Sequence, residues 1–371
     1  MNSAIIFVKN QKEADLASNC LFDKYLIDYT VSEIKRLDVD AIYLAGNLDF
    51  EVENVVKRDN IEEIIDELKE TEGKCLLVSP FYPLIDKEEY QKLLSYSENT
   101  VFVDEDSEIV PVFSIDNKYL ASFDKLAYSG IAIDAEKAKR FTGIKDISVF
   151  QDIIKEKINN KWLNKGVIIT DSKNTIIGVD VSIDKNTTIY PNTVIEGKCL
   201  IGKNNVITSG TFMKNVVLGD NNTISNSNIK DTIIHNNVVV GTNSVIDEDS
   251  ELFDEVIIRS QVKLSNAKIG KGTIVEPLTY LGNAQIGESV KIGAGVVTVD
   301  NDGRSKHSTV IKYHSVIGSN VTLIAPIAIG EYVVVAAGST IDQDIKDGDM
   351  AIARLYQQNK KGYGYKYIRE D

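Results

Sequence analysis

The chain has 371 residues, a formal net charge of −14 and three widely spaced cysteines. This length allows two domains. The negative charge and the lack of a Lys/Arg stripe argue against nucleic-acid binding, which needs a basic face. The cysteines show neither zinc-ligand spacing nor a disulfide framework, which favours a reducing compartment. No apolar run reaches the ~18 residues that span a bilayer, and "MNSAIIFVKNQKEAD" becomes polar too early for a signal peptide, so we expect a cytoplasmic protein without membrane contacts.

Residues 1–162 have the pattern of an α/β domain. Helical patterns, such as "YLIDYTVSEIKRL" and "IEEIIDELKE", lie between short apolar runs that are typical of buried strands. These runs are "AIIFV" (4–8), "AIYLA" (41–45), "CLLVS" (75–79) and "TVFVD" (100–104). The alternation predicts a mostly parallel, Rossmann-like sheet covered on both faces. The segment "VFQDIIKEKINNKWL" (149–163) predicts a linker helix at the end of this domain.

The first predicted strand lacks the loop that a phosphate-binding sheet would place after it. Such a loop is rich in glycine because its backbone approaches the phosphates closely. Here the strand is followed by "KNQKEADLASN", and the first glycine of the chain is Gly46. The sequence therefore gives no phosphate-binding signal in this domain.

From residue 163 to about 355, aliphatic residues recur every six positions. The phase slips after Met213 and then resumes. The members are Ile177, Ile183, Ile189, Ile195, Ile201, Ile207, Leu218, Ile224, Ile234, Val240, Ile246, and later Ile311, Ile317, Leu323, Ile329, Val335 and Ile341. Six is neither a helical nor a simple strand period, because residue i+6 of an α-helix lies about 120° off the original face.

A six-residue unit is typical of a solenoid of triangular cross-section. Each unit supplies a short strand and a corner, and the aliphatic residues of successive coils stack inside. Burial of each aliphatic side chain is worth roughly 1.5–3 kcal/mol. Gly and Asn after the aliphatic residue, as in "IGKNN" and "LGDNN", suit corners that need positive φ. An ordinary β-sandwich with coincidental spacing is the alternative, and two long runs of hits argue against it. Residues 356–371 are expected to form a C-terminal tail.

Several motifs together resemble one known family. They are "YLGNAQIGESVKIGAG", "DNDGRSKHST", "VIGSNVTLIAPIAIG", "AAGSTI" and "AIAR". With the two-part layout, they resemble the bifunctional N-acetylglucosamine-1-phosphate uridyltransferase / glucosamine-1-phosphate acetyltransferase family, which makes UDP-N-acetylglucosamine for bacterial cell walls. The resemblance is dense over roughly 265–355, generic over 160–250, and confined to the order of elements over 1–160. It implies a left-handed β-helix, although parallel crossovers are generally right-handed.

The front domain departs from this family where its chemistry is expected. The family's Gly-rich loop is missing, the position of its magnesium-binding Asp reads Phe81, and that of its metal-binding Asn reads Lys145. A phenylalanine cannot ligate magnesium and a lysine repels it. We therefore expect a degenerate nucleotidyltransferase-like domain without a metal site, in which magnesium binding and uridyl transfer are lost.

The resemblance implies an acetyl-CoA site in the β-helix. The family's cofactor positions are Ala294, Ser319, Ala337 and Arg354 here, all of matching type. Small side chains leave room for the pantetheine arm between neighbouring prisms, and Arg354 offers a fork for a phosphate. The alternative interpretation is that the alanines are small only because coil corners are tight.

The acceptor side is altered. Tyr280, Asp302 and Lys306 are retained, and with Lys291 and Asp300 they are the expected substrate-binding residues. Tyr280 and Lys306 are also expected in the catalytic group. The position of the family's general base, a histidine, reads Pro277, which cannot accept a proton. The position of its sugar-phosphate lysine reads Ser265.

The histidines are the candidates for a replacement base, because imidazole titrates in the required range. His307 lies in the polar loop that interrupts the repeat between Thr298 and Thr309, and we list it as the candidate. His314 is a weaker one, and His235 is expected to be structural. In the family this loop closes over the sugar in a cleft between subunits; the alternative is a tolerated surface insertion.

Two functional hypotheses follow. The first is an acetyl-CoA-dependent acyltransferase that acts on an amino sugar phosphate or a nucleotide sugar. The second is a non-catalytic homologue that binds a nucleotide sugar or CoA, or that serves as a regulator or scaffold. Both imply a homotrimer, and a surviving nucleotidyltransferase ranks last.

Overall fold

The structure is a computed structural model that describes residues 2–22, 24–46, 48 and 50–366. The chain divides into two compact units, residues 1–155 and 156–371. The division falls within α5 (Ile147–Asn164), the helix that the sequence predicts between the two parts. Among the described residues, no helix is long and apolar enough to cross a membrane.

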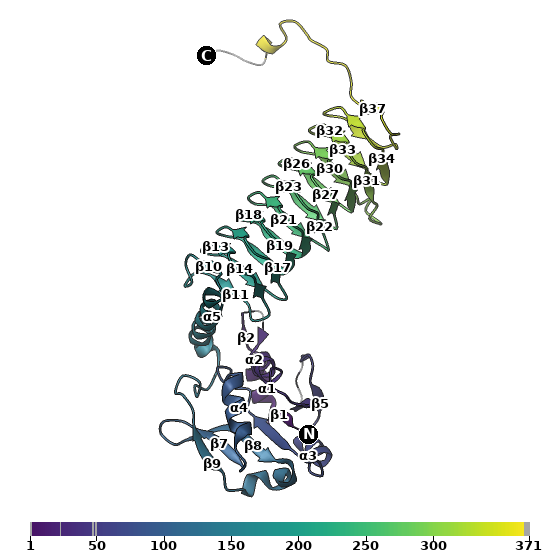
Figure 1. Ribbon diagram of the computed structural model, residues 1–371. Helices are drawn as coiled ribbons and strands as arrows, with labels where there is room; N and C mark the ends of the chain where they lie inside the picture. Colours follow the sequence, from purple (N-terminus) through teal and green to yellow (C-terminus); the bar gives the residue numbers. More distant parts are fainter. Residues whose placement is uncertain (1, 23, 47, 49, 367–371) are drawn as a thin grey trace. The chain divides into compact units, whose positions relative to one another are not determined.

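The first unit is an α/β fold around a seven-stranded sheet of order β5-β4-β1-β6-β8-β7-β9 (Figure 1). Its elements are β1 (Ser3–Phe7), α1 (Gln11–Ala17), β2 (Cys20–Leu21), β3 (Lys24–Tyr25), α2 (Leu26–Ile34), β4 (Ala41–Ala45), β5 (Val56–Arg58), α3 (Ile61–Leu68), β6 (Lys74–Val78), α4 (Lys87–Ser95), β7 (Thr100–Val103), β8 (Ile109–Asp116), η1 (Asn117–Lys125), β9 (Ser129–Ala132) and η2 (Ile144–Asp146). The four predicted strands are present as β1, β4, β6 and β7.

The sheet of this unit is mostly parallel, as predicted. Strand β1 pairs in parallel with β4 and β6, and its residues Ala4, Ile5 and Ile6 are fully buried because both faces of the sheet are covered. Strand β8 was not predicted, and it pairs antiparallel with both β6 and β7. Its Pro111 interrupts the apolar run, which hides the strand in the sequence.

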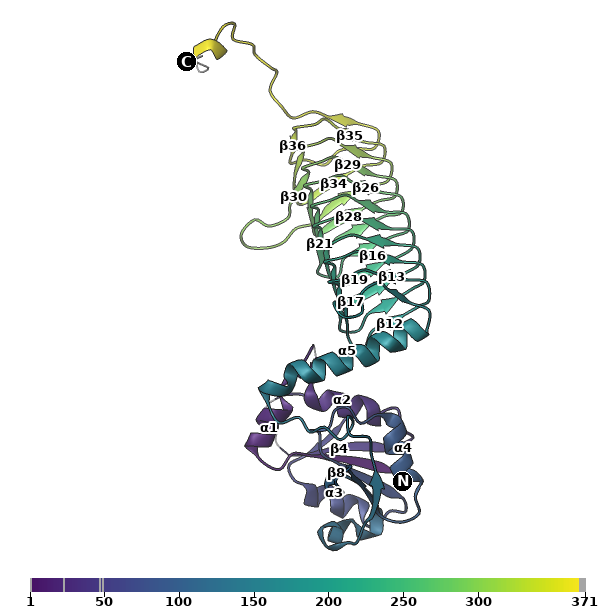
Figure 2. The ribbon, with the colours of Figure 1, turned by 90° about the vertical axis from the view of Figure 1, so that its left-hand side faces the viewer.

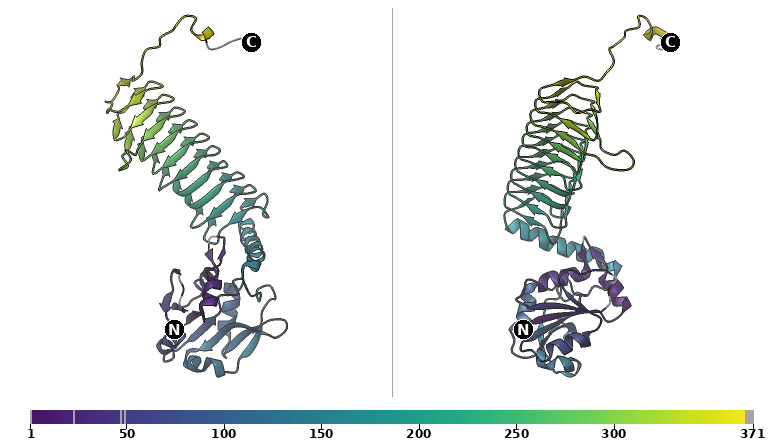
Figure 3. Two further views of the ribbon diagram at one scale, coloured as in Figure 1. Left: turned by 180° about the vertical axis from the view of Figure 1, so that it is seen from behind. Right: turned by 90° about the vertical axis from the view of Figure 1, so that its right-hand side faces the viewer.

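The second unit is a parallel β-helix with three faces, which confirms the predicted fold class (Figures 2 and 3). Face C is the eleven-stranded sheet: β10 (Ile168–Ile169), β13 (Thr188–Ile189), β16 (Val206–Ile207), β18 (Thr223–Ile224), β20 (Val239–Val240), β23 (Ile257–Ile258), β26 (Ile274–Val275), β29 (Lys291–Ile292), β32 (Val316–Ile317), β35 (Val334–Val335) and β37 (Met350–Ala351).

The other two faces share the seventeen-stranded sheet. Face A holds β11 (Ile176–Ile177), β14 (Val194–Glu196), β21 (Val245–Asp247), β24 (Lys263–Ser265), β27 (Tyr280–Gly282), β30 (Val297–Val299), β33 (Thr322–Ile324) and β36 (Thr340–Ile341). Face B holds β12 (Ser182–Ile183), β15 (Leu200–Ile201), β22 (Glu251–Leu252), β25 (Lys268–Ile269), β28 (Ala284–Ile286), β31 (Thr309–Ile311) and β34 (Ile327–Ile329). The longer strands β17 (Phe212–Leu218) and β19 (Asn228–Ile234) turn from face A to face B.

The six-residue ladder forms the core. Every aliphatic residue that the sequence singles out is buried. Ile177 pairs with Ile195, one eighteen-residue coil further on. The slip after Met213 reflects a shorter coil, because Ile201 pairs with Leu218 instead of the residue eighteen positions on. The inward residues therefore stay stacked although the sequence period changes.

The corners have the predicted chemistry. Asn204, Asn221 and Asn320 adopt φ of 58°, 59° and 55°, a region that asparagine tolerates better than most residues. Asn204 Nδ2 also donates to Asn221 Oδ1 at 3.1 Å, so corner side chains of adjacent coils bond to one another. Positive φ and side-chain bonding together explain the Asn-rich corners.

The second half of α5 closes the first coil. Trp162 is buried in the β-helix core, and Asn159 Nδ2 donates to the carbonyl oxygens of Ser172 and Thr175 at 2.8 and 3.0 Å. A cap of this kind is needed because the end of a solenoid would otherwise expose its core. Beyond β37 the chain contains η3 (Gly364–Lys366); residues 367–371 of the predicted tail lie outside the described residues.

The polar loop replaces one corner without disturbing the stack. It connects β30 to β31 and projects from the side of the prism (Figure 2). After the loop the register resumes, since Ala284 pairs with Thr309 and Ile286 with Ile311. The insertion therefore lengthens one coil only at its surface.

Candidate functional site

Three small residues stack at the corner between faces C and A, and we call Ala294, Ser319 and Ala337 the small-residue column. Asn320 N donates to Ala294 O at 2.8 Å, and Gly338 N donates to Ser319 O at 2.9 Å, so the members lie on successive coils. Ala294 is half-buried, whereas Ser319 and Ala337 are exposed. The column is therefore an open strip of surface without bulky side chains.

Glycines beside the column keep the coils close together. A Cβ at Gly293 would lie 2.5 Å from Ser319 N, and one at Gly318 would lie 2.5 Å from Ala337 N. These are backbone atoms, which cannot turn aside as a flexible side chain could. The close approach brings the column members within one coil spacing of each other.

Arg354 lies at the C-terminal end of the column. Its Nη1 donates to Ala337 O at 2.7 Å, and the side chain is exposed. A guanidinium has five N–H donors, so this bond leaves others for an anionic ligand. The structure thus brings together all four residues that the sequence predicts for the cofactor.

Pro277 adjoins the other end of the column, because its carbonyl oxygen accepts from Gly295 N at 3.0 Å. The side chain in this place has no proton acceptor. The column therefore lies beside a position where the sequence resemblance expects a base and the chain supplies none.

A hydrogen-bonded group surrounds Tyr280 on face A. Tyr280 Oη donates to Asp300 Oδ1 at 3.3 Å, and Asn283 Nδ2 donates to Asp300 Oδ2 at 2.7 Å. Asp300 is only 6% exposed. A Cβ at Gly282 would overlap both the Tyr280 hydroxyl and the Asp300 carboxylate, so the glycine makes room for this pair. Burial, and then the Asp300 charge, raises the pKa of the Tyr280 hydroxyl, which stays protonated at neutral pH.

Glu248 joins this group to the projecting loop. Its Oε2 accepts from Ser265 Oγ at 2.7 Å and from Lys306 Nζ at 3.1 Å. The Ser265 bond, and then the Lys306 bond, lowers the pKa of the Glu248 carboxyl, so it is ionised at neutral pH. We call Glu248, Ser265, Tyr280, Asn283, Asp300 and Lys306 the Tyr280 network.

His307 is held within the loop itself. Its Nε2 lies 3.0 Å from Asp302 Oδ2 and 3.2 Å from Ser305 Oγ. The His307 bond and the backbone N–H groups of Ser305 and Arg304 hold the pKa of the Asp302 carboxyl well below its usual range. Among the described contacts, none joins the imidazole to Tyr280. The side chains of His307 and Asp302 bond to each other within the loop, and their described side-chain contacts do not reach the Tyr280 network.

Lys291 lies apart from Tyr280, on face C, where it pairs with Ile274 and Val316. The outward residues along this face are otherwise apolar or Thr. They are Ile168, Thr188, Val206, Thr223, Val239, Ile257, Ile274, Val316, Val334 and Met350. Ile168 and Met350 are 51% and 62% exposed. An apolar strip of this length is typical of a surface that another protein covers.

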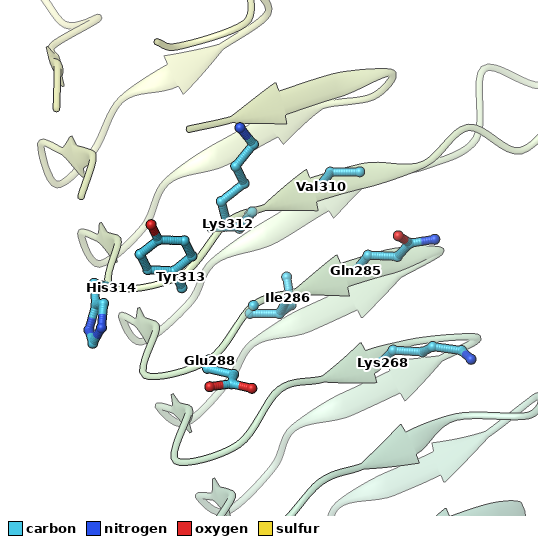
Figure 4. A pocket seen from close by; sticks show the side chains of 10 residues that line it. Lys268, Gln285, Ile286, Glu288, Val310, Lys312, Tyr313 and His314 are labelled. Carbon is cyan, nitrogen blue, oxygen red and sulfur yellow. The ribbon is translucent and has the colours of Figure 1, made fainter. Parts of the chain in front are cut away.

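A pocket of about 670 Å³ lies elsewhere, on face B and its corner with face C (Figure 4). Lys268, Gln285 and Val310 line it from the strands, and Tyr313 and His314 line it at the corner. His314 stacks on Tyr332, with ring centroids 5.1 Å apart. This pocket contains none of the residues that the sequence predicts for the cofactor or the acceptor, and His314 lies at the corner between faces B and C, not at the corner of the small-residue column.

The first unit holds Phe81 and Lys145 at the positions where the resemblance expects metal ligands. Phe81 is 2% exposed and packed in the core, and its carbonyl oxygen accepts from Phe141 N at 2.8 Å. Lys145 lines a separate surface pocket with Lys12 and Arg140. Across the part of the chain that the structure describes, no three His, Cys, Asp or Glu side chains are grouped as metal ligands.

The sequence did not single out Glu248 or Asn283. The coil period offered a signal, because Glu248 and Ser265 are 17 residues apart and Asn283 and Asp300 are also 17 apart. Residues one coil apart come into contact across the sheet. The link between Glu248 and Lys306, 58 residues apart, depends on the loop and has no such signal.

Comparison with known proteins gives relatives of one kind. The chain is 38% identical over 235 residues to the bifunctional protein GlmU of Shouchella clausii, which covers 62% of this chain and 52% of that protein. It is 38% identical over 244 residues to the GlmU of a Geobacillus species, which covers 64% and 53%. The chain thus spans about half the length of these curated relatives.

Solved structures match more loosely. LpxA from Acinetobacter baumannii is 19% identical with a TM-score of 0.33, and the match covers 49% of this chain and 70% of that one. No protein-family model matches the sequence. In sequence, this chain is therefore a divergent relative of the bifunctional GlmU proteins, similar to them over about three fifths of its length.

Proposed function

We propose that this chain is an acyltransferase that moves an acetyl group from acetyl-CoA to the amine of an amino sugar. The single observation that carries the proposal is the small-residue column, which ends in Arg354 and whose Ala294 lies on the same coil as Asp300 and Lys306 of the Tyr280 network. The similarity to the GlmU proteins supports the same activity. An amino sugar phosphate and a nucleotide sugar are the two acceptor classes that the resemblance implies.

The column fits the donor because a long, narrow thioester arm needs a strip without side chains. Ala294, Ser319 and Ala337 provide it, and the guanidinium of Arg354 can pair with a phosphate of CoA. In the reaction the amine nitrogen forms a bond to the thioester carbonyl carbon, the carbon–sulfur bond breaks, and the amine proton leaves as free CoA thiol forms.

The network fits the acceptor because it offers hydrogen-bond donors and acceptors to sugar hydroxyls. Tyr280 and Lys306 would orient the ring, and the Asp300 carboxylate would hold the amine and accept its proton. A general base contributes ~10²–10⁴-fold to such reactions, so a weakly basic substitute slows transfer without abolishing it. His307 stays a weaker candidate for the base, because Asp302 already holds it.

The apolar strip of face C favours assembly with further copies of the chain. Lys291 and Tyr280 lie on different faces, and a site shared by neighbouring copies would let both contact one acceptor. A homotrimer would provide such a site, and its mass in solution can be measured by size-exclusion chromatography with light scattering. We also propose that the first unit no longer transfers uridylyl groups, because Phe81 fills the position of the family's magnesium ligand.

Calorimetric titration with acetyl-CoA and thiol release on a panel of amino sugars test the activity. Ala337→Trp should block the column and lower acetyl-CoA affinity at least tenfold. The matched control is Ala328→Trp, since Ala328 is also exposed but lies on face B. Equal affinities for the two variants would contradict the site.

Pro277 favours a second candidate, a non-catalytic homologue that binds the same ligands as a regulator or scaffold. This protein would bind acetyl-CoA or a nucleotide sugar without releasing CoA thiol. Tight acetyl-CoA binding with no thiol release on any amine identifies it. Absence of acetyl-CoA binding would remove the first function and leave a scaffold.

A further inference from the structure

The charges near Tyr280 are mostly negative. Three carboxylates lie in this region, from Asp247, Glu248 and Asp300, and all three raise the pKa of the Tyr280 hydroxyl. Asp247 pairs in register with Ser265, which pairs with Gly282 under the Tyr280 side chain. The three acids therefore surround one place on the surface of face A.

The nearby lysines do not reverse this sign. Lys306 is bound to Glu248, and Lys263 lies beside Tyr280 in register and helps lower the pKa of Glu248. Two positive charges meet three negative ones, so the place keeps a net negative charge. A phosphate there would meet three carboxylates, and of the two lysines Lys306 is already paired with Glu248, which leaves Lys263 as the cation without an ion pair among the described contacts.

The Asp247 carboxylate has an acceptor atom to spare. Its Oδ1 is buried and has no hydrogen-bond partner among the described residues. A buried carboxylate oxygen without a donor is costly, and the amine or hydroxyl groups of a ligand would supply the missing donor. The same acid thus favours a ligand with N–H or O–H groups by its missing donor as well as by its charge.

We propose that the acceptor is an amine-bearing sugar without a phosphate on the ring that enters the Tyr280 network. The inference rests on the proposed function, because it takes the network as the acceptor-binding part of the site. It departs from both acceptor classes that the resemblance implies, because each of them carries phosphate on the sugar. An ammonium or neutral amine is attracted to Asp247, Glu248 and Asp300, and a sugar phosphate is repelled by them.

Binding of glucosamine and of glucosamine 1-phosphate to the full chain, saturated with CoA, tests the inference by calorimetry. Glucosamine should bind roughly tenfold tighter than glucosamine 1-phosphate. Repulsion between the phosphate and carboxylates a few ångströms away at a partly exposed site changes the affinity by about one power of ten. The preference should shrink as salt is raised. Tighter binding of the phosphate would overturn the inference.

Two variants locate the effect. Glu248→Gln and Asp247→Asn should each reduce the preference for glucosamine severalfold. Asp249→Asn is the matched control, since Asp249 is exposed beside them and makes no side-chain contact with the network in the described residues. A preference that both variants leave unchanged would contradict the assignment. The salt series on the unaltered protein keeps the test valid if a variant fails to fold.

Failure of the proposed function gives a different result. If neither sugar is acetylated but glucosamine still binds preferentially, catalysis fails and the charge selectivity holds. If glucosamine 1-phosphate is acetylated with the higher kcat/KM, catalysis holds and the inference fails.

Discussion

The two units bury and expose their polar chemistry in opposite ways. In the α/β unit the position where the resemblance expects a metal ligand holds Phe81, which packs into the core and is 2% exposed. In the β-helix the core is mainly a ladder of aliphatic residues, and the polar residues of interest lie on the corners and outward faces. A solenoid can therefore change its surface chemistry without touching its core, whereas in the α/β unit the corresponding position is part of the packed core.

The largest expected effect comes from breaking the coil spacing of the β-helix. Gly318→Val places a Cβ 2.5 Å from Ala337 N, so adjacent coils must move apart. We expect the free energy of unfolding of this unit to fall by about 3 kcal/mol, the upper range for overpacking, and acetyl-CoA binding to be lost. Denaturant unfolding measures it.

Gly364→Val is the matched control, because a Cβ there has no neighbour within 4 Å. Equal stability of the two variants would show that the coils can separate cheaply. The view that the β-helix core is rigid while its surface can vary would then be wrong.

The next effect tests whether the two cores are independent. Ile258→Ala in the β-helix and Leu76→Ala in the α/β unit each remove a fully buried side chain. Each should lower the free energy of unfolding of its own unit by about 2–5 kcal/mol. Two calorimetric transitions, each shifted by only one of the variants, would show that the two units unfold independently. A single transition shifted equally by both variants would show that the two cores are not independent.

Arg354→Ala should affect binding and leave folding unchanged. The side chain is exposed, and within the described residues its hydrogen bond goes to Ala337 O. Loss of a charge-assisted bond to a CoA phosphate costs about 1.5–3 kcal/mol, or roughly ten- to a hundredfold in affinity. Arg140→Ala, in the α/β unit, should leave acetyl-CoA affinity unchanged. Calorimetric titration of both variants distinguishes a site on the β-helix from a general charge effect.

The smallest effect concerns the pH dependence of the loop. The depressed pKa of Asp302 means that its contacts are fully present above the ordinary carboxyl range and are lost as pH falls through the lowered value. His307→Ala should raise the pKa of Asp302 towards ordinary values without changing global stability. NMR titration of the Asp302 side-chain carbon measures the pKa, and denaturant unfolding measures the stability. An unchanged pKa in this variant would show that His307 does not hold the loop.

Much of the fold could be predicted because the six-residue period of the β-helix is visible in the spacing of its aliphatic residues. Ile311, Ile317 and Leu323 repeat every six residues, and a parallel β-helix is the structure that buries all three. The α/β unit was harder, since β8 contains Pro111 and does not alternate. The three-strand core of β1, β4 and β6 was evident because each strand is a continuous apolar run.

The site could be predicted only in part. The small-residue column followed from the resemblance, and the structure brings Ala294, Ser319 and Ala337 into line. The contact of Lys306 with Glu248 was not foreseeable, because it depends on how a loop folds back over an earlier coil. The sequence suggested His307 as a base only because imidazole has the right chemistry. In the structure His307 contacts Asp302, and this contact holds the loop.

The loop between β30 and β31 leaves the strand register unchanged on either side. Its length and composition are thus free to vary while the stack beneath remains the same. Exchanging this segment for that of a relative should transfer acceptor preference without loss of folding. The β-helix can therefore acquire new specificities through changes in single corner loops.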